Sequence, residues 1–220
     1  MDSAINFARL GLRVIPAVGR AGIAGTYERA TTNEAQIVEW WEGPYKGYNV
    51  AVVPGDSILV IDQDARHNGP KHWNELIQGH EAPNGLTVFT PTGGVHLYTG
   101  IGEDTVIRGR DSLLALGVDG WTGNRILLVP PSIHPLTGTP YFFRDGEPDW
   151  SLGRVLIPPA PIWLIEKIIA IERLPASARP GGRHQDLLFF ALRARADNGL
   201  DTHELYEALK LYADYWGYDD

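Results

Sequence analysis

The sequence predicts an α+β fold, with a mixed domain of strands and helices over residues 1–158 and a small helical module over residues 159–220. Short apolar runs bounded by Gly and Pro turns, typical of strands, fill the first part of the chain. Pro158, Pro159 and Pro161 then indicate a linker, after which apolar residues recur at helical spacing. Hydrophobic residues make up 44% and charged residues 21% of the chain, which excludes a disordered protein and allows one large core.

Local signals place each element of the mixed domain. Thr31, followed three residues later by Glu34, has the spacing of a capping box and predicts the start of a helix. Pro54–Gly55 separates two apolar runs and predicts a hairpin, whereas Pro130–Pro131 ends a strand because proline cannot donate to a ladder. The expected elements, in chain order, are a helix at 2–11, a strand at Leu12–Pro16, a glycine-rich loop at Gly19–Gly25, a helix from Thr31 to Gly43, strands at Asn49–Val53 and Ser57–Asp62, a helix at 71–79, a second hairpin with strands at Leu86–Thr90 and Val95–Thr99, a strand at Arg125–Val129, an extended piece at Pro140–Phe143, and helices of the module at Ile162–Ile171, Gln185–Ala196 and Thr202–Tyr215.

Charge and cysteine content limit the function. The net charge of −8 argues against a general polyanion binder, although an acidic total can include carboxylates that hold metal ions. The clearest basic segment runs from Arg173 to Arg195; within it, Arg179 and Arg183 are candidates for contacts with the phosphates of a nucleic acid, with a solvated helix face as the alternative. The absence of cysteine excludes disulfides and cysteine-bound zinc and fits a cytoplasmic protein, and no stretch has the length of a membrane span.

The first candidate site residues follow an apolar run. Ile58–Ile61 is apolar on both faces, as in a central buried strand, and leads into Asp62-Gln63-Asp64. Residues two apart on a strand share a face, so both carboxylates point the same way and repel each other unless protons or cations compensate. Oxygen ligands of this kind suit Mg²⁺ or Mn²⁺. The alternative is a pair of solvated aspartates in a turn.

Two further groups follow along the chain. Gly93-Gly94-Val95-His96 combines a turn whose backbone N–H groups could approach an anion with a histidine at the start of a strand; a hairpin turn with a half-buried histidine is the alternative. Asp119 ends another apolar run, as Asp62 does, and Arg125 follows it. Ser132 and His134 come directly after the proline pair, where both could also be ordinary loop residues.

The order and spacing of these groups resemble the primase–polymerase (prim-pol) domains of phage and plasmid replication proteins, in the archaeo-eukaryotic primase superfamily. The resemblance runs from about Phe7 to Phe143. The motifs that carry it are Phe7-Ala8-x-x-Gly11-Leu12-x-Val14-x-Pro16, Ala30-Thr31-Thr32 before Trp40-Trp41, Asn49-Val50-Ala51-Val52, Asp62/Asp64, Gly93-Gly94-Val95-His96-Leu97-Tyr98, Gly117-Val118-Asp119 and Pro130-Pro131-Ser132-x-His134.

The resemblance implies a primase-type catalytic core of mixed and antiparallel sheets with flanking helices, one half of it RRM-like. It implies a DNA primase and polymerase acting on a single-stranded DNA template, a primer and nucleoside triphosphates, with a fused or separate helicase as partner. Asp62, Asp64 and Asp119 would bind a pair of Mg²⁺ or Mn²⁺ ions, and His96 would contact the incoming nucleotide. Gly93, Gly94, Arg125, Ser132 and His134 are further nucleotide-binding candidates.

The chain departs from the family pattern at two places. Relatives often have an arginine soon after the third acid, where this chain has Gly120-Trp121, so Arg125 is the candidate replacement. A Lys-Pro common early in the family is missing around Arg20. The chain also has no Walker-type phosphate loop, so any helicase activity belongs elsewhere.

Other functions fit parts of the pattern. A replication-initiator fragment that binds DNA without catalysis would not need the complete acidic set. A glycosyltransferase could use Asp-x-Asp for a nucleotide–sugar, and a metal-dependent nuclease could use the same acids to activate water. These readings differ in whether the chain consumes triphosphates on a template.

Overall fold

The computed structural model describes residues 1–102, 105, 107 and 111–172. The chain divides into two compact units, Met1–Ile168 and Ile169–Asp220, and the account below concerns the first. The helices expected at Gln185–Ala196 and Thr202–Tyr215, with Arg179 and Arg183, lie outside the described residues. Within the described ranges, no helix is both long and apolar enough to cross a membrane.

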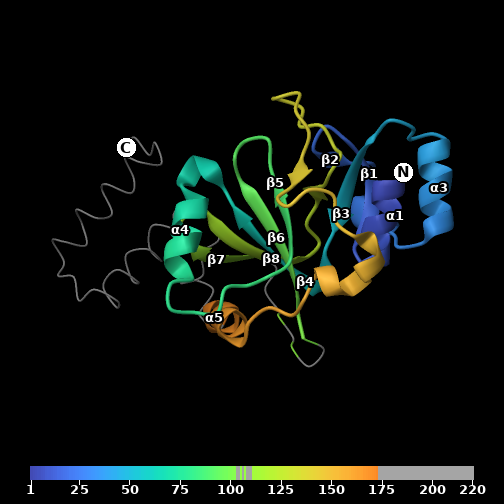
Figure 1. Cartoon of the computed structure of the whole chain (residues 1–220). Helices are drawn as coiled ribbons and strands as arrows, with labels where there is room; N and C mark the ends of the chain where they lie inside the picture. The colour runs from blue at the N-terminus through green and yellow to red at the C-terminus, as the bar shows by residue number, and fades with distance from the viewer. Residues whose placement is uncertain (103–104, 106, 108–110, 173–220) are drawn as a thin grey trace. The chain divides into compact units, whose positions relative to one another are not determined.

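The described strands form two antiparallel sheets with helices packed against them, which confirms the α+β prediction (Figure 1). The first sheet has the order β2-β1-β3-β9, and the second has the order β10-β5-β6-β4-β8-β7. The strands are β1 (Arg13–Val18), β2 (Ala21–Gly22), β3 (Asn49–Val53), β4 (Gly55–Gln63), β5 (Leu86–Phe89), β6 (Val95–Gly100), β7 (Asp111–Ala115), β8 (Val118–Gly123), β9 (Leu127–Leu128) and β10 (Phe142–Phe143). The helices are α1 (Asp2–Arg9), α2 (Thr26–Arg29), α3 (Glu34–Glu42), α4 (Gly69–Leu76) and α5 (Ile162–Glu172), with 3₁₀ segments η1 (Ala65–His67) and η2 (Trp150–Leu156).

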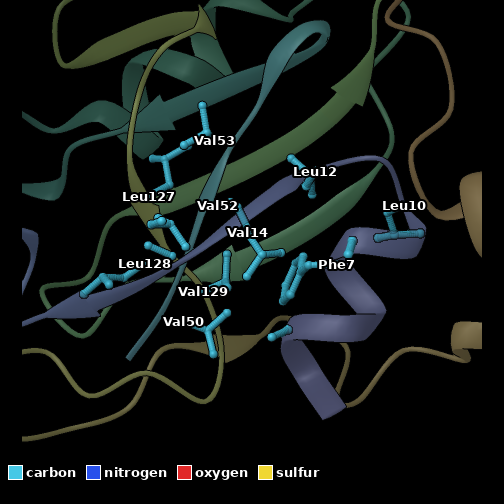
Figure 2. Packing of buried hydrophobic residues seen from close by; sticks show 14 of the residues in the cluster. Phe7, Leu10, Leu12, Val14, Val50, Val52, Val53, Leu127, Leu128 and Val129 are labelled. Carbon is cyan, nitrogen blue, oxygen red and sulfur yellow. The ribbon is translucent and has the colours of Figure 1, made fainter. Parts of the chain in front are cut away.

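The four-stranded sheet is covered by α1 and α3. Alternating residues of β1 and β3 meet Phe7 and Leu10 from the end of α1, and β9 closes the far side of the cluster (Figure 2). The predicted capping box is wrong. Asn33, not Thr31, caps α3, because its side-chain oxygen accepts from Gln36 N at 3.1 Å, whereas Thr31 Oγ1 accepts from Asn33 N.

The predicted hairpin at Pro54–Gly55 is also wrong. β3 lies between β1 and β9 in the four-stranded sheet, and β4 lies between β6 and β8 in the other. Both edges of each strand are therefore occupied, and the turn passes the chain from one sheet to the next. Gly55 has a φ of 71°, which allows this change of direction at low steric cost. The second expected hairpin, β5 with β6, is confirmed.

Strand β4 is the central element of the six-stranded sheet. Ile58 and Val60 face the core shared with the four-stranded sheet. The opposite face carries Leu59, and a Cβ added to Gly120 on β8 would lie 3.5 Å from atoms of both Leu59 and Ile168 of α5. Because side chains alternate along a strand, Asp62 continues the face of Ile58 and Val60. The side chain of Asp62 therefore lies at the edge of the core between the two sheets.

Candidate active site

Three site residues lie in one row across the six-stranded sheet. Asp62 on β4 is directly opposite His96 on β6 and directly opposite Asp119 on β8. Residues paired in this way share a face, with Cβ atoms about 4.5–5.5 Å apart. The pairing of β4 with β8 thus brings together Asp62 and Asp119, which are 57 residues apart in the sequence. The next row on the same face, toward the core, is Tyr98–Val60–Trp121.

Asp64 stands just beyond the end of β4 and caps the 3₁₀ segment η1. Its Oδ1 accepts the backbone N–H of Arg66 at 2.9 Å. The Arg66 guanidinium also binds this carboxylate, with Nη2 to Oδ2 at 2.6 Å and Nε at 3.1 Å from both oxygens. The backbone of Asp64 is fixed by its N–H, which donates to Gly117 O at 2.8 Å. This close approach requires Gly69, because a Cβ there would lie 2.3 Å from Gly117 O.

Asp62 and Asp64 differ in their electrostatics. Burial, with the charges of Asp119 and Asp64, raises the pKa of Asp62 to about 7. Burial alone would also raise the pKa of Asp64, but the hydrogen bonds from the Arg66 side chain and backbone outweigh it and lower the pKa. The negative charge of Asp64 is therefore stabilised by Arg66, whereas that of Asp62 is unfavourable and would be stabilised by a nearby positive charge.

His96 is a neutral, buried neighbour of Asp62. Only 7% of the residue is exposed, and burial, assisted by the charge of Arg20, lowers its pKa to about 4. Its Nε2 lies 3.5 Å from Asp62 Oδ1, while its Nδ1 has no hydrogen-bond partner within the described part of the chain. The hydroxyl of Tyr98, two residues further along β6, is likewise buried without a partner there. Buried polar atoms are normally paired, so both atoms indicate a place for water or ligand.

Asp62, Asp64 and His96 open onto a pocket of about 570 Å³, within the range of about 300–1,000 Å³ typical of small-molecule sites. The six-stranded sheet forms one wall and β9 with the segments around it forms another. The residues that line the pocket are Arg20, Asp62, Gln63, Asp64, Arg66, Thr90, Thr92, Gly94, His96, Trp121, Ile126, Leu127, Leu128, His134, Leu136 and Tyr141. Two aspartates, two arginines and two histidines thus face one volume between the sheets.

Two lining arginines were missed by the sequence reasoning. Arg20 comes from the β1–β2 turn, where the sequence had been noted only for lacking a Lys-Pro. Arg66 comes from η1, two residues after Asp64, and this spacing was the available signal, since an Asp-x-Arg turn can form a local carboxylate–guanidinium pair. Tyr141 also lines the pocket, and its ring lies 6.3 Å from that of His96 and 6.1 Å from that of His134.

The other nucleotide-binding candidates occupy different settings. The N–H groups of Gly93 and Gly94 already donate to Thr90, at 3.0 Å and 2.9 Å, so phosphate contact through them requires the turn to open. Ser132 is buried, and its hydroxyl both donates to Val50 O and accepts from Val50 N. His134 lines the pocket. Arg125 does not, and its guanidinium lies 5.3 Å from the centre of the Trp121 ring.

The arrangement of the carboxylates decides whether the pocket could hold a divalent cation. Within the residues that the structure describes, no three Asp, Glu or His side chains are gathered closely enough to hold a metal ion as they stand. The donor chemistry nevertheless fits, because oxygen ligands suit Mg²⁺ or Mn²⁺, and the pKa of Asp62 is raised by burial and by the charges of Asp119 and Asp64, which a cation would offset. Asp64 fits once its carboxylate exchanges Arg66 for a cation.

Comparison with known proteins identifies the family of the chain. A comparison with curated proteins found no match. The sequence does match the family described as "Prim-Pol: Bifunctional DNA primase/polymerase, N-terminal" over residues 4–163, which is more than half of the chain and includes the row of Asp62, His96 and Asp119. The family resemblance read from the sequence is thereby confirmed, and with it the assignment as an enzyme of the nucleotidyltransferase class. This chain belongs to the Prim-Pol family of bifunctional DNA primase/polymerases.

Proposed function

We propose that the chain makes and extends primers on single-stranded DNA by metal-dependent nucleotidyl transfer, with Asp62, Asp64 and Asp119 as the metal-binding carboxylates, within a primase-type core that serves phage or plasmid replication. The observation that carries the proposal is the in-register row of His96, Asp62 and Asp119 beside Asp64. Of these residues, Asp62, Asp64 and the buried neutral imidazole of His96 line one pocket together with Arg20 and Arg66.

The chemistry is attack by a primer 3′ hydroxyl on the α-phosphate of a nucleoside triphosphate, with pyrophosphate as the leaving group. Mg²⁺ or Mn²⁺, when bound by Asp62, Asp64 and Asp119, would supply charge stabilisation to the attacking and leaving oxygens. The protein's own part is positioning and charge. The sheet fixes Asp62 and Asp119 by backbone register, and the bond from Asp64 N to Gly117 O fixes the third acid.

The remaining lining residues supply contacts for the nucleotide. Arg20 and Arg66 bring positive charge to a pocket in a chain of net charge −8, as phosphates require. His96 is kept neutral by burial, so one ring nitrogen can donate to a phosphate oxygen while the other accepts. Trp121 and Tyr141 add aromatic surface at the sides of the pocket, which suits the sugar and base.

The test is synthesis without a primer. The protein is incubated with a single-stranded DNA template, Mn²⁺ and all four deoxynucleoside triphosphates, and a parallel reaction contains ribonucleoside triphosphates. We expect products in the wild type and none in Asp62→Ala or Asp64→Ala, both of which should stay folded. Asp56→Ala, which changes an exposed acid on the same strand, is the matched control and should retain full activity.

The alternatives give different results in the same assay. A DNA-binding fragment without catalysis would bind template and yield no product in any reaction. A nuclease would degrade the template without consuming triphosphates, and a glycosyltransferase would consume only nucleotide–sugars. Full synthesis by the Asp62→Ala variant would contradict the assignment of the carboxylates as catalytic metal ligands.

A further inference from the structure

Arg66 occupies the same oxygens of Asp64 that a cation would need. Its guanidinium meets both carboxylate oxygens, and the shortest contact is 2.6 Å. A carboxylate that accepts an arginine fork has its in-plane lone pairs engaged. The arginine and a divalent ion therefore compete for Asp64.

The arginine can leave without disturbing the carboxylate. Its side chain is 75% exposed, so its release breaks no core packing. The backbone N–H of Arg66 holds Asp64 Oδ1 independently of the guanidinium, at 2.9 Å. The backbone of Asp64 is held by Gly117. Asp64 consequently keeps its position when the guanidinium moves.

The released guanidinium has a second destination. Arg66 lines the same pocket as Asp62, His96 and Arg20. A nucleoside triphosphate in that pocket would bring several phosphate oxygens, and an arginine fork pairs with phosphate as well as with carboxylate. Binding of a cation together with a triphosphate would therefore act on Arg66 twice. The cation would displace its guanidinium from Asp64, and the phosphates would bind the guanidinium.

We propose that Arg66 is a positioning residue with two partners. When no cation is bound, its guanidinium pairs with the Asp64 carboxylate. When a divalent cation binds Asp64, the guanidinium moves to the phosphates of the triphosphate. The inference rests on the proposed function, because it assigns Asp64 to the cation and the pocket to the nucleotide. It adds a coupling between the two ligands that the carboxylate set alone does not contain.

The coupling predicts opposite effects of a single substitution. Arg66→Ala removes a competitor for Asp64, so the affinity for Mn²⁺ alone should rise, by roughly two- to fivefold if the exposed ion pair has an ordinary strength. The same variant lacks the phosphate contact, so the affinity for a non-hydrolysable deoxynucleoside triphosphate at saturating Mn²⁺ should fall about tenfold. A purely structural arginine would give two losses or no change.

The experiment measures both affinities by calorimetry on the full chain, with circular dichroism as the check on folding. Arg9→Ala is the matched control, because Arg9 forms the same kind of two-bond pair with Glu34, at 2.9 Å for both bonds, and does not line the pocket. Arg66→Gln serves as a second variant that retains length and removes the charge. Both Arg66 variants should show the gain and the loss together, and Arg9→Ala should show neither.

Each other outcome overturns the inference. If the wild type binds both ligands and the Arg66 variants lose affinity for both, Arg66 only organises the site, and the proposed function stands without the coupling. If only the triphosphate affinity falls, Arg66 is a phosphate ligand that does not compete with the cation. If the wild type binds neither Mn²⁺ nor the triphosphate, the proposed function fails and the inference fails with it.

Discussion

Asp62 and Asp119 lie directly opposite each other on the neighbouring antiparallel strands β4 and β8. Like charges in such a pair destabilise a sheet, and burial of Asp62 limits the screening that water could provide. The active-site row therefore opposes folding when no cation is bound.

Asp62→Asn should consequently stabilise the metal-free protein. Replacing the carboxylate removes the repulsion and retains the shape, and a shift of the pKa from 3.8 to about 7 corresponds to a gain of at most about 4 kcal/mol in the free energy of unfolding at neutral pH. The measurement is urea denaturation in EDTA. Asp56→Asn, at an exposed position of the same strand, should leave the midpoint unchanged. A less stable Asp62→Asn variant would contradict the repulsion argument.

The same group gives the metal-free protein a pH dependence of known sign. The pKa of Asp62 is raised from its ordinary value of 3.8 to about 7 in the folded chain. Its stabilising contribution is therefore complete below about pH 4, and it is lost as the pH rises toward 7. His96 acts in the opposite sense, because its pKa is lowered to about 4 and its contribution disappears as the pH falls. The difference in unfolding free energy between wild type and Asp62→Asn isolates the aspartate, and it should grow from pH 4 to pH 7.

His96→Ala should weaken triphosphate binding more than template binding. The imidazole lies in the row beside Asp62, where a ligand's phosphates would meet it, and its Nδ1 has no partner among the described residues. Both affinities are measured in the same protein preparation. His96→Asn, which retains a polar group in a similar volume, should show a smaller loss. If triphosphate affinity is unchanged while the melting temperature falls, the histidine is a core residue only.

Ser132→Ala should reduce stability and spare nucleotide binding. Pro130 and Pro131 cannot donate beyond Val129, and the Ser132 hydroxyl continues the ladder by bonding Val50 N and Val50 O, each at 2.8 Å. Leaving a buried Val50 N–H without this acceptor should cost about 1–3 kcal/mol. Thermal unfolding and triphosphate titration of the variant test the two halves of this prediction. A large loss of triphosphate affinity in a stable variant would instead support Ser132 as a nucleotide-binding residue.

Arg179 and Arg183 remain a prediction from sequence. Replacing both with alanine should weaken single-stranded DNA binding and flatten its dependence on salt, because arginine–phosphate contacts release counterions. Substitution is a cleaner test than truncation near residue 160, since Leu164 and Ile168 of α5 are almost completely buried. Unchanged affinity and salt slope would make the arginines part of a solvated surface.

The sequence was sufficient for those parts of the site that depend on local pattern. The apolar run before Asp62 predicted a central strand, which the structure contains. The two-residue spacing predicted that Asp62 and Asp64 share a strand face; Asp64 instead lies beyond the end of β4, although both acids line one pocket. The β5–β6 hairpin followed from its Gly-rich turn. Asp119 was found through the family resemblance, because nothing local to it specifies that β8 pairs with β4.

The errors arose where long-range pairing decides the structure. Pro54–Gly55 carries an ordinary turn signal, yet the strands on either side pair with partners elsewhere in the chain, so local chemistry could not reveal the change of sheet. Arg20 reaches the pocket only because the β1–β2 turn lies beside it. Asn33 displaced Thr31 as the cap because Thr31 forms backbone bonds with Val14, another contact distant in sequence.

The position of β4 has a consequence for how the enzyme comes into being. Both neighbours of β4 follow it in the chain, each as part of a local hairpin, β5–β6 and β7–β8. During synthesis on the ribosome, about sixty further residues are therefore added after Asp62 before Asp119, the residue that pairs with it, is made. Closing that span is slow because its loop entropy is lost before the contacts form. The repulsion between these two carboxylates therefore arises only when β8 joins the sheet beside β4, late in the synthesis of the domain.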